Sequence, residues 1–221
     1  MIALPNWDQI SAVCIDMDGT LIDLYFDNHF WKVYLPEIYA KHQNCSLDAS
    51  RNFLFQLFHE QKGQLNWYCL DFWSKTLKLD IMALKQSLAE DIRLRENALK
   101  FLLYVNQLGK PLYLVTNAHR HTLAIKLKHT GIESYFQKII SAHDLGLAKE
   151  QDGFWPMLAE LLNLDLHSTL FIDDSESVLN AAKQAGVGHV IAIFQPDSQL
   201  LGEYIDGFPH LHNFSDMMEA K

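Results

Sequence analysis

The chain has 221 residues, a formal net charge of −9 at pH 7 and a hydrophobic fraction of 49%. That length fits one compact domain or a core with a smaller insert, and the hydrophobic fraction excludes an intrinsically disordered protein. The excess of acidic over basic residues, 27 against 18, argues against nonspecific binding to nucleic acid or anionic membranes. A small phosphorylated substrate held in a local site is still compatible with this charge.

The three cysteines, Cys14, Cys45 and Cys69, form no CxxC pair. We interpret them as reduced, mostly buried thiols, and not as a disulfide framework or a zinc site. No run approaches the ~18 consecutive apolar residues of a membrane span. The first 13 residues also lack the basic and then apolar regions of a secretory signal. We therefore expect a cytoplasmic location.

The first predicted strand, residues 12–16, is a short apolar run that ends in a polar loop. The segment from about residue 23 to residue 95 contains no convincing strand and is rich in aromatic, amphipathic stretches. Helices are predicted there at 26–39, 46–61, 65–77 and 81–91. Because so long a segment inside an α/β domain is typically a functional lid, we predict a helical cap at 23–95 and a core at 1–22 and 96–221.

Beyond this insert, apolar strands alternate with helical patterns. Strands are predicted at 112–116, 138–141, 169–172 and 189–193, and helices at 119–130, 154–162 and 177–185. This alternation indicates an α/β fold with a parallel sheet and right-handed crossovers. The tail after residue 194 is polar and turn-rich, and it predicts no further element.

Polar side chains gather just past the carboxyl ends of four predicted strands. They are Asp16, Asp18 and Thr20, then Thr116 and Asn117, then Lys149, and finally Asp173 and Asp174. Each group alone would be typical of a turn, a helix cap or a solvated lysine. Together they indicate one site, because ligands of open α/β sheets bind outside the carboxyl ends of the strands.

The chemistry of this set favours phosphoryl transfer. Several carboxylates without histidine or cysteine partners suit a hard cation, and Mg²⁺ fits best. A carboxylate can act as a nucleophile towards phosphorus while a metal and a lysine neutralise the transferred group. A second carboxylate two residues further on can protonate the leaving oxygen.

Four motifs of the chain resemble those of the haloacid dehalogenase superfamily. Residues 16–23 (DMDGTLID) resemble its first motif, and residues 114–117 (LVTN) resemble its second. Lys149 matches the third motif, and residues 171–175 (FIDDS) match the fourth. The resemblance spans the whole core and implies a Rossmann-like fold with a helical cap inserted after the first strand.

The resemblance also implies a role for each motif residue. Asp16 would be the nucleophile that forms a phospho-aspartate, and Asp18 would be the general acid and base. Thr116 would bind phosphoryl oxygens, and Asn117 would contact the substrate. Lys149 would hold both the phosphoryl group and Asp16. The magnesium ligands would be Asp16, the backbone carbonyl of Asp18 and Asp174, while Asp173 would reach the metal through water or orient Lys149.

Two departures from the family pattern affect these assignments. The third motif usually continues with prolines, but Lys149 is followed here by Glu-Gln-Asp. Lys126 and Lys128 lie inside a helical pattern and Lys138 begins a strand, so Lys149 is still the best candidate. The later acid of the common fourth motif falls on Val178, which is why direct metal contact is assigned to Asp174.

The insert contains the unusual stretch NWYCLDFW at residues 66–73. With residues 17–24, 26–31 and 116–119, it resembles a bacterial subgroup of GMP/IMP nucleotidases, which implies hydrolysis of purine nucleoside monophosphates. Aromatic side chains can stack on a purine, so Trp67 and Trp73 are candidate base contacts. The alternative is that these aromatics pack inside the cap.

Other functions stay open at this point. A sugar-phosphate phosphatase or a β-phosphoglucomutase-like enzyme would share the core chemistry, and a noncatalytic nucleotide-sensing module belongs to a different class. His119 could lie near the phosphate or the ribose, but His119 and His121 are two residues apart and should not share a helix face. We expect a monomer or a weak homodimer.

Overall fold

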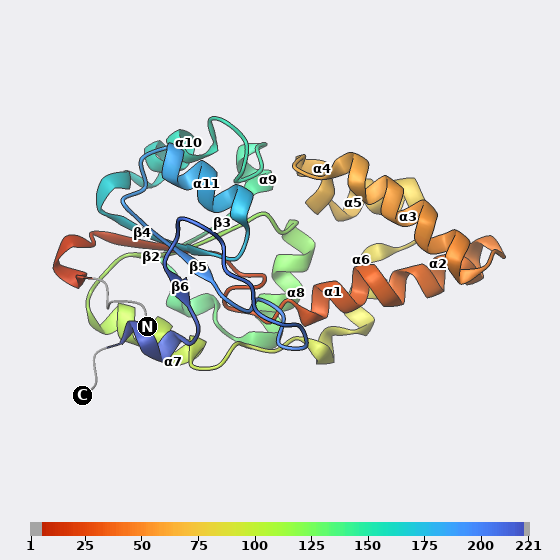
Figure 1. Ribbon diagram of the computed structural model, residues 1–221, viewed down its shortest axis with the longest axis horizontal. Coiled ribbons are helices and arrows are strands. Elements are labelled where there is room, and N and C mark those ends of the chain that lie inside the picture. Colours follow the sequence, from red (N-terminus) through yellow and green to blue (C-terminus); the bar gives the residue numbers. More distant parts are fainter. Residues whose placement is uncertain (1–5, 219–221) are drawn as a thin grey trace.

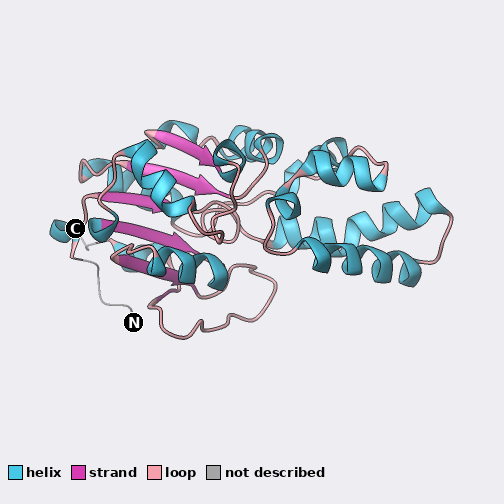
Figure 2. Cartoon of the chain, turned by 90° about the horizontal axis from the view of Figure 1, so that it is seen from above, coloured by secondary structure: helices cyan, strands magenta, loops and turns pink. Residues whose placement is uncertain are grey.

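The computed structural model describes residues 6–218, which form a parallel sheet with helices on both faces and a separate group of helices at one end (Figures 1 and 2). The six strands lie in the order β3-β2-β1-β4-β5-β6. Their bounds are Ala12–Ile15 (β1), Leu112–Thr116 (β2), Lys138–Ser141 (β3), Thr169–Asp173 (β4), His189–Ile193 (β5) and His210–Leu211 (β6).

The helices fall into two groups. Those that pack on the sheet are α7 (Ala98–Gln107), α8 (Arg120–Thr130), α9 (Ala142–Leu145), α10 (Phe154–Leu162) and α11 (Glu176–Gln184). The insert contains α1 (Tyr25–His29), the π-helical turn η2 (Phe30–Tyr34), α2 (Leu35–Gln43), α3 (Leu47–Gln61), α4 (Leu65–Tyr68), α5 (Leu70–Leu77) and α6 (Ile81–Ser87). Short 3₁₀ turns lie at Trp7–Gln9, Ala89–Asp91, Glu133–Tyr135, Leu166–Ser168 and Phe214–Met217.

The predicted α/β fold is confirmed, and all five predicted strands are present to within one residue at their ends. Central strands β1, β2 and β4 are buried along their whole length, as expected for a sheet covered on both faces. Helix α7 and the two-residue strand β6 were not predicted. Strand β6 exists because the tail returns to pair with β5, which no local pattern encodes.

Alternate residues of each strand face opposite layers of the core. Val13 and Ile15 of β1 belong to the hydrophobic cluster beneath α7 and α8. Cys14, which lies between them, belongs to the cluster beneath α10 and α11. The two layers hold the sheet rigidly, so the polar residues at the carboxyl ends of the strands are fixed in position.

The insert has a hydrophobic cluster of its own, which includes Phe30, Leu54 and Trp73. It leaves and rejoins the sheet domain through two adjacent antiparallel segments. Leu21 O accepts from Arg95 N at 2.8 Å and Arg93 O accepts from Asp23 N at 2.9 Å. The division of the chain at residues 23 and 95 stays a prediction, and these paired segments are where we propose the boundary.

The tail after residue 194 packs against the start of the insert. Pro196 O accepts from Leu24 N at 3.0 Å, and Asp197 Oδ2 accepts from Asn28 Nδ2 at 2.7 Å. The tail therefore supports the junction of core and insert, although its sequence predicted no structure. Within residues 6–218, no helix is both long enough and apolar enough to cross a membrane.

Candidate active site

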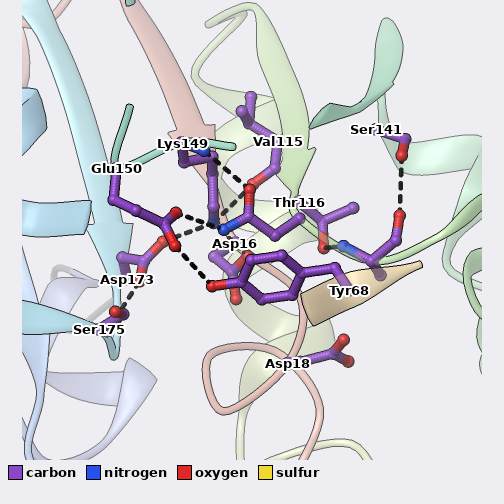
Figure 3. A network of polar contacts seen from close by, with 12 residues as sticks. Asp16, Asp18, Tyr68, Val115, Thr116, Ser141, Lys149, Glu150, Asp173 and Ser175 are labelled. Atoms are coloured by element: carbon purple, nitrogen blue, oxygen red, sulfur yellow. Dashed lines mark hydrogen bonds and ion pairs between the residues drawn. The ribbon is translucent and has the colours of Figure 1, made fainter. Parts of the chain in front are cut away.

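Lys149 lies at the centre of the polar cluster at the carboxyl end of the sheet (Figure 3). Its Nζ donates to Asp16 Oδ1 at 2.5 Å, to Asp173 Oδ2 at 2.6 Å and to the carbonyl of Val115 at 3.1 Å. Lys149 is only 2% exposed. Lys149 thus contacts the first-motif aspartate, and its role in the reaction stays a prediction.

Thr116 ends β2 beside this cluster and is also buried. Its Oγ1 accepts from Ala118 N at 3.0 Å, which fixes the side chain at the start of the following loop. The hydroxyl hydrogen is still available to a ligand. Thr116, Asp16 and Lys149 all line a small hollow of about 190 Å³.

The loop that carries Lys149 is held by a chain of hydrogen bonds that ends in the insert. Asn117 Oδ1 accepts from Lys149 N, and Asn117 Nδ2 donates to Glu150 Oε2, both at 2.8 Å. Tyr68 of α4 donates its hydroxyl to Glu150 Oε1 at 2.9 Å. Asn117, which we expected to bind substrate, therefore uses both ends of its amide to position the loop. Glu150, which stands where the family pattern has prolines, helps to hold the same loop through its two carboxylate oxygens.

The acidic side chains here carry more negative charge than Lys149 can neutralise. Burial, opposed by Lys149 and helped by Asp173, raises the pKa of Asp16 to about 6. Burial, followed by Asp173 and Asp16, raises the pKa of Asp174 well above its usual range. A divalent cation fits such a cluster of carboxylates, because it would favour their charged forms.

Both carboxylate oxygens of Asp173 already accept a hydrogen bond from the protein. Its Oδ2 accepts from Lys149, and its Oδ1 accepts from Ser175 N at 2.8 Å. Asp16 and Asp174 are therefore the side chains that could hold a cation directly, together with the Asp18 carbonyl. Of the two roles expected for Asp173, the geometry favours orientation of Lys149.

Gly19 makes room for Asp174. Its φ of +81° lies in the left-handed region, and a Cβ on this residue would come within 2.3 Å of Asp174 Oδ2. Any other residue would therefore be strained in its backbone and would collide with the carboxylate. The glycine of the DxDGT motif is required by both constraints.

Asp18 is held by a lysine that the sequence analysis set aside. Lys126 of α8 is fully buried, and its Nζ donates to both Asp18 Oδ1 and Asp27 Oδ2. Lys85 of α6 donates to Asp27 Oδ1 at 2.5 Å. Lys126 lies within a helix, as its sequence pattern predicts, and the side of α8 that carries it faces the first motif.

These alternating charges join the core to the insert. Burial raises the pKa of Asp18 to about 6 despite the attraction of Lys126. Burial alone would raise the pKa of Asp27, but the attraction of Lys126 and Lys85 outweighs it and lowers that pKa to about 2. Asp27 is thus a permanent anion between two lysines, whereas Asp18 can gain and lose a proton near neutral pH.

A larger cavity of about 570 Å³ lies beside the acidic hollow, under the insert. Asp18, Leu24, Tyr68 and Ala118 line both spaces. The aromatic side chains on the walls of the larger cavity are Trp31, Phe55, Phe58, Trp67, Tyr68 and Trp73. A small hollow rich in carboxylates therefore adjoins a larger cavity with aromatic walls.

The two tryptophans expected to contact a base differ in their surroundings. Trp67 is half-buried and lines the cavity. Trp73 also borders it but is only 1% exposed, belongs to the hydrophobic cluster of the insert, and donates its Nε1 to Trp67 O at 2.9 Å. Trp67 is thus placed for ligand contact, and Trp73 is placed mainly to support the insert.

His119 also lines the larger cavity. It is the N-cap of α8 and has an extended backbone, so it does not follow the helical geometry of His121. Both imidazoles consequently face Asp71, with His119 Nε2 at 3.6 Å and His121 Nδ1 at 3.9 Å from its oxygens. The two histidines do not share a helix face, because only His121 lies within the helix, yet both reach the same carboxylate.

Comparison with known proteins agrees with this geometry. The family model described as "haloacid dehalogenase-like hydrolase" matches residues 10–186. The chain belongs to this family. The predicted superfamily is therefore confirmed, as is the prediction that the protein is a hydrolase.

One curated relative and two solved structures show what this haloacid dehalogenase-like hydrolase is similar to. It is 38% identical over 214 residues to GMP/IMP nucleotidase YrfG of Escherichia coli K12, covering 97% of this chain and 96% of that protein. A HAD phosphatase from Thermococcus onnurineus has the same fold, with a TM-score of 0.79 at 20% identity over 94% of this chain and 96% of that one. The HAD-hydrolase YfnB from Bacillus subtilis, described as bound to magnesium, has a TM-score of 0.65 at 21% identity, covering 94% of this chain and 96% of that one.

Proposed function

We propose that the protein is a Mg²⁺-dependent 5′-nucleotidase that hydrolyses purine nucleoside monophosphates, chiefly GMP and IMP. The observation that carries this proposal is the aromatic cavity of about 570 Å³ that shares four lining residues with the acidic hollow around Asp16. A nucleotide needs both spaces at once, a charged one for its phosphate and an aromatic one for its base. Near full-length similarity to a GMP/IMP nucleotidase supports the same substrate class.

The proposed reaction is a double displacement at phosphorus. An oxygen of Asp16 attacks phosphorus to form a phospho-aspartate, and the bond to the nucleoside 5′ oxygen breaks. Asp18 gives its proton to that leaving oxygen. Asp18 then takes a proton from a water molecule, whose oxygen attacks the phosphorus, so that inorganic phosphate leaves and Asp16 is restored. One water is consumed for each ester bond that is broken.

The surroundings of Asp18 support its role as acid and base. Its raised pKa of about 6 makes both protonation states accessible near neutral pH. Lys126 fixes the carboxyl group in place and stabilises its charged form after the proton is given up. Lys126 is therefore a positioning residue in the proposed mechanism, since it acts through Asp18.

The remaining core residues would bind and orient the phosphoryl group. The Lys149 ammonium and the Thr116 hydroxyl would donate to its oxygens, which adds positive charge where negative charge develops. Mg²⁺, when bound, would neutralise part of that charge, and Asp16, the Asp18 carbonyl and Asp174 would hold it. Magnesium in a solved relative of the same fold supports this choice of ion.

A panel of phosphate esters tests the proposal directly. Phosphate release would be measured with Mg²⁺ for GMP, IMP, AMP, CMP, glucose 6-phosphate, β-glucose 1-phosphate and p-nitrophenyl phosphate. We expect kcat/KM for GMP and IMP to exceed that for CMP and both sugar phosphates by at least about tenfold, the effect of ~1.4 kcal/mol of base-specific binding. A preference for a sugar phosphate would contradict the proposed substrate while leaving the core chemistry intact.

A further inference from the structure

A cysteine and two histidines come together where the insert meets the core. One ligand atom of each of Cys69, His119 and His143 lies within 4.8 Å of the others. Of the three cysteines, only Cys14 is buried, so the expectation of mostly buried thiols was wrong. Cys69 belongs to the turn between α4 and α5 of the insert, and this turn faces α9 of the core in Figure 1.

The sheet brings the two histidines together. Strands β2 and β3 are parallel neighbours, and Thr116 pairs with Ser141 at their carboxyl ends. His119 follows one strand by three residues and His143 follows the other by two, and Ser141 Oγ donates to Ala118 O at 2.8 Å to join the two loops. The imidazole rings consequently lie edge to face with their centroids 4.9 Å apart.

One imidazole nitrogen of His143 lacks a hydrogen-bond partner in the described part of the chain. Its Nε2 is buried and has no hydrogen-bond partner among the described residues. Burial, followed by the neighbouring His119, lowers the pKa of this imidazole to about 4. His143 is therefore neutral near pH 7, and an unpartnered lone pair on a neutral imidazole is the usual ligand of a transition metal.

We propose that Cys69, His119 and His143 form a second metal site, which takes a borderline or soft cation such as Zn²⁺ and joins the insert to the core. Thiolate and imidazole ligands select such ions, whereas Mg²⁺ prefers oxygen and would stay at the acidic cluster. Three protein ligands and one water complete a tetrahedron. Binding replaces the Cys69 S–H bond by a sulfur–metal bond and releases one proton to solvent.

The distances are compatible with this coordination. Zinc–sulfur and zinc–nitrogen bonds of ~2.3 Å and ~2.0–2.1 Å place tetrahedral ligand atoms about 3.4–3.6 Å apart. The three ligand atoms here lie within 4.8 Å of one another. Side-chain rotations that move these atoms by about an ångström would bring all three within bonding distance of one zinc ion. Two of the ligands follow rigid strands, and the third belongs to the insert, so the ion would hold the two parts together.

This clamp has a consequence that rests on the proposed function. Caps that cover an active site commonly have to open to admit substrate and release product. A Zn²⁺ ion shared by Cys69 and the two histidines would oppose that opening and slow turnover at saturating Mg²⁺. The metal site itself does not depend on this activity and is tested by spectroscopy.

The test uses the full-length protein saturated with Mg²⁺, with Co²⁺ as a spectroscopic probe and Zn²⁺ as the competing ion. We expect one equivalent of Co²⁺ to give a thiolate-to-cobalt charge-transfer band that Zn²⁺ removes. Cys69→Ser should abolish the band and weaken Zn²⁺ binding at least about 100-fold, and His143→Gln should weaken it at least tenfold, because even outer-shell losses cost ~10–100-fold. Serine at position 69 can still cap α5, as the cysteine does through Phe72 N.

Cys45→Ser provides the matched control, because Cys45 is exposed and lies outside the cluster. It should keep the band and the wild-type affinity for Zn²⁺. Zn²⁺ should also lower kcat of the wild type and of Cys45→Ser but not of Cys69→Ser. Co²⁺ binding to the wild type without a thiolate band would overturn the proposal. Zn²⁺ binding that survives Cys69→Ser but is lost in Asp71→Asn would also overturn it, because the ion would then lie at Asp71, His119 and His121.

Discussion

Replacing Trp67 by alanine tests whether the insert recognises the base of the substrate. Trp67 is half-buried on the wall of the large cavity, and it contacts Phe58 edge to face at 5.6 Å between ring centroids. Loss of one aromatic that stacks on a base removes ~1–3 kcal/mol, which corresponds to a fall of about 5–150-fold in kcat/KM. This fall should affect GMP and IMP but hardly p-nitrophenyl phosphate, whose aryl group cannot fill the same space.

Trp73→Ala is the contrasting variant. Trp73 is 1% exposed, and its ring packs against Trp31, Phe58 and Phe72 within the insert. Truncation of so buried a tryptophan costs ~3–5 kcal/mol, which lowers the midpoint of thermal unfolding by roughly 6–20 °C for a chain of this size. Its effect on catalysis should be similar for all three substrates, because the damage lies in the packing of the insert.

The assay compares kcat/KM of both variants for GMP, IMP and p-nitrophenyl phosphate, alongside thermal unfolding. The structure predicts a substrate-selective loss with little destabilisation for Trp67→Ala, and a nonselective loss with clear destabilisation for Trp73→Ala. If Trp67→Ala lowers kcat/KM equally for all three substrates, or for none of them, then Trp67 does not contact the base and our interpretation of the cavity is refuted.

Four further predictions concern the core. Asp16→Asn should stay folded, by circular dichroism, with turnover at least ~10³-fold lower; near-normal turnover would exclude covalent catalysis. Excess chelator should abolish phosphate release and Mg²⁺ restore it; activity that persists would exclude the metal role. Gly19→Ala, which collides with Asp174, should weaken Mg²⁺ activation, seen as a higher half-saturating concentration, whereas Gly63→Ala, at a glycine of similar φ (+79°) with no atom within 4 Å of the added Cβ, should not. Tyr68→Phe loses the hydrogen bond to Glu150, ~0.5–1.5 kcal/mol, and should raise KM about 2–10-fold for every substrate; an unchanged KM would mean that this bond does not contribute to substrate binding.

The sequence alone was enough to predict the sheet and the chemical nature of its site. Buried parallel strands are continuous apolar runs, and such runs are visible without any tertiary information. The residues that follow them, such as Asp16, Thr116 and Lys149, had to meet at one edge because all the strands are parallel. The specific first motif then identified the family, which the family model confirmed.

Contacts between segments far apart in the chain were decided only by the tertiary structure. Lys126 had the pattern of an ordinary helical lysine, and its pairing with Asp18 depends on how α8 is rotated against the first loop. Glu150 stood where prolines were expected, and its link to Tyr68 depends on the position of the insert. Neither contact has a local signal, because each joins residues more than 80 positions apart.

The same limit applies to the cluster of Cys69, His119 and His143. These three residues show no metal-binding spacing in the sequence, because they come from the insert and from two different strand ends. Local patterns encode which residues face a core and where a helix starts, since these depend on near neighbours along the chain. Which side chains meet across the junction of insert and core depends on packing, and packing is a property of the folded molecule alone.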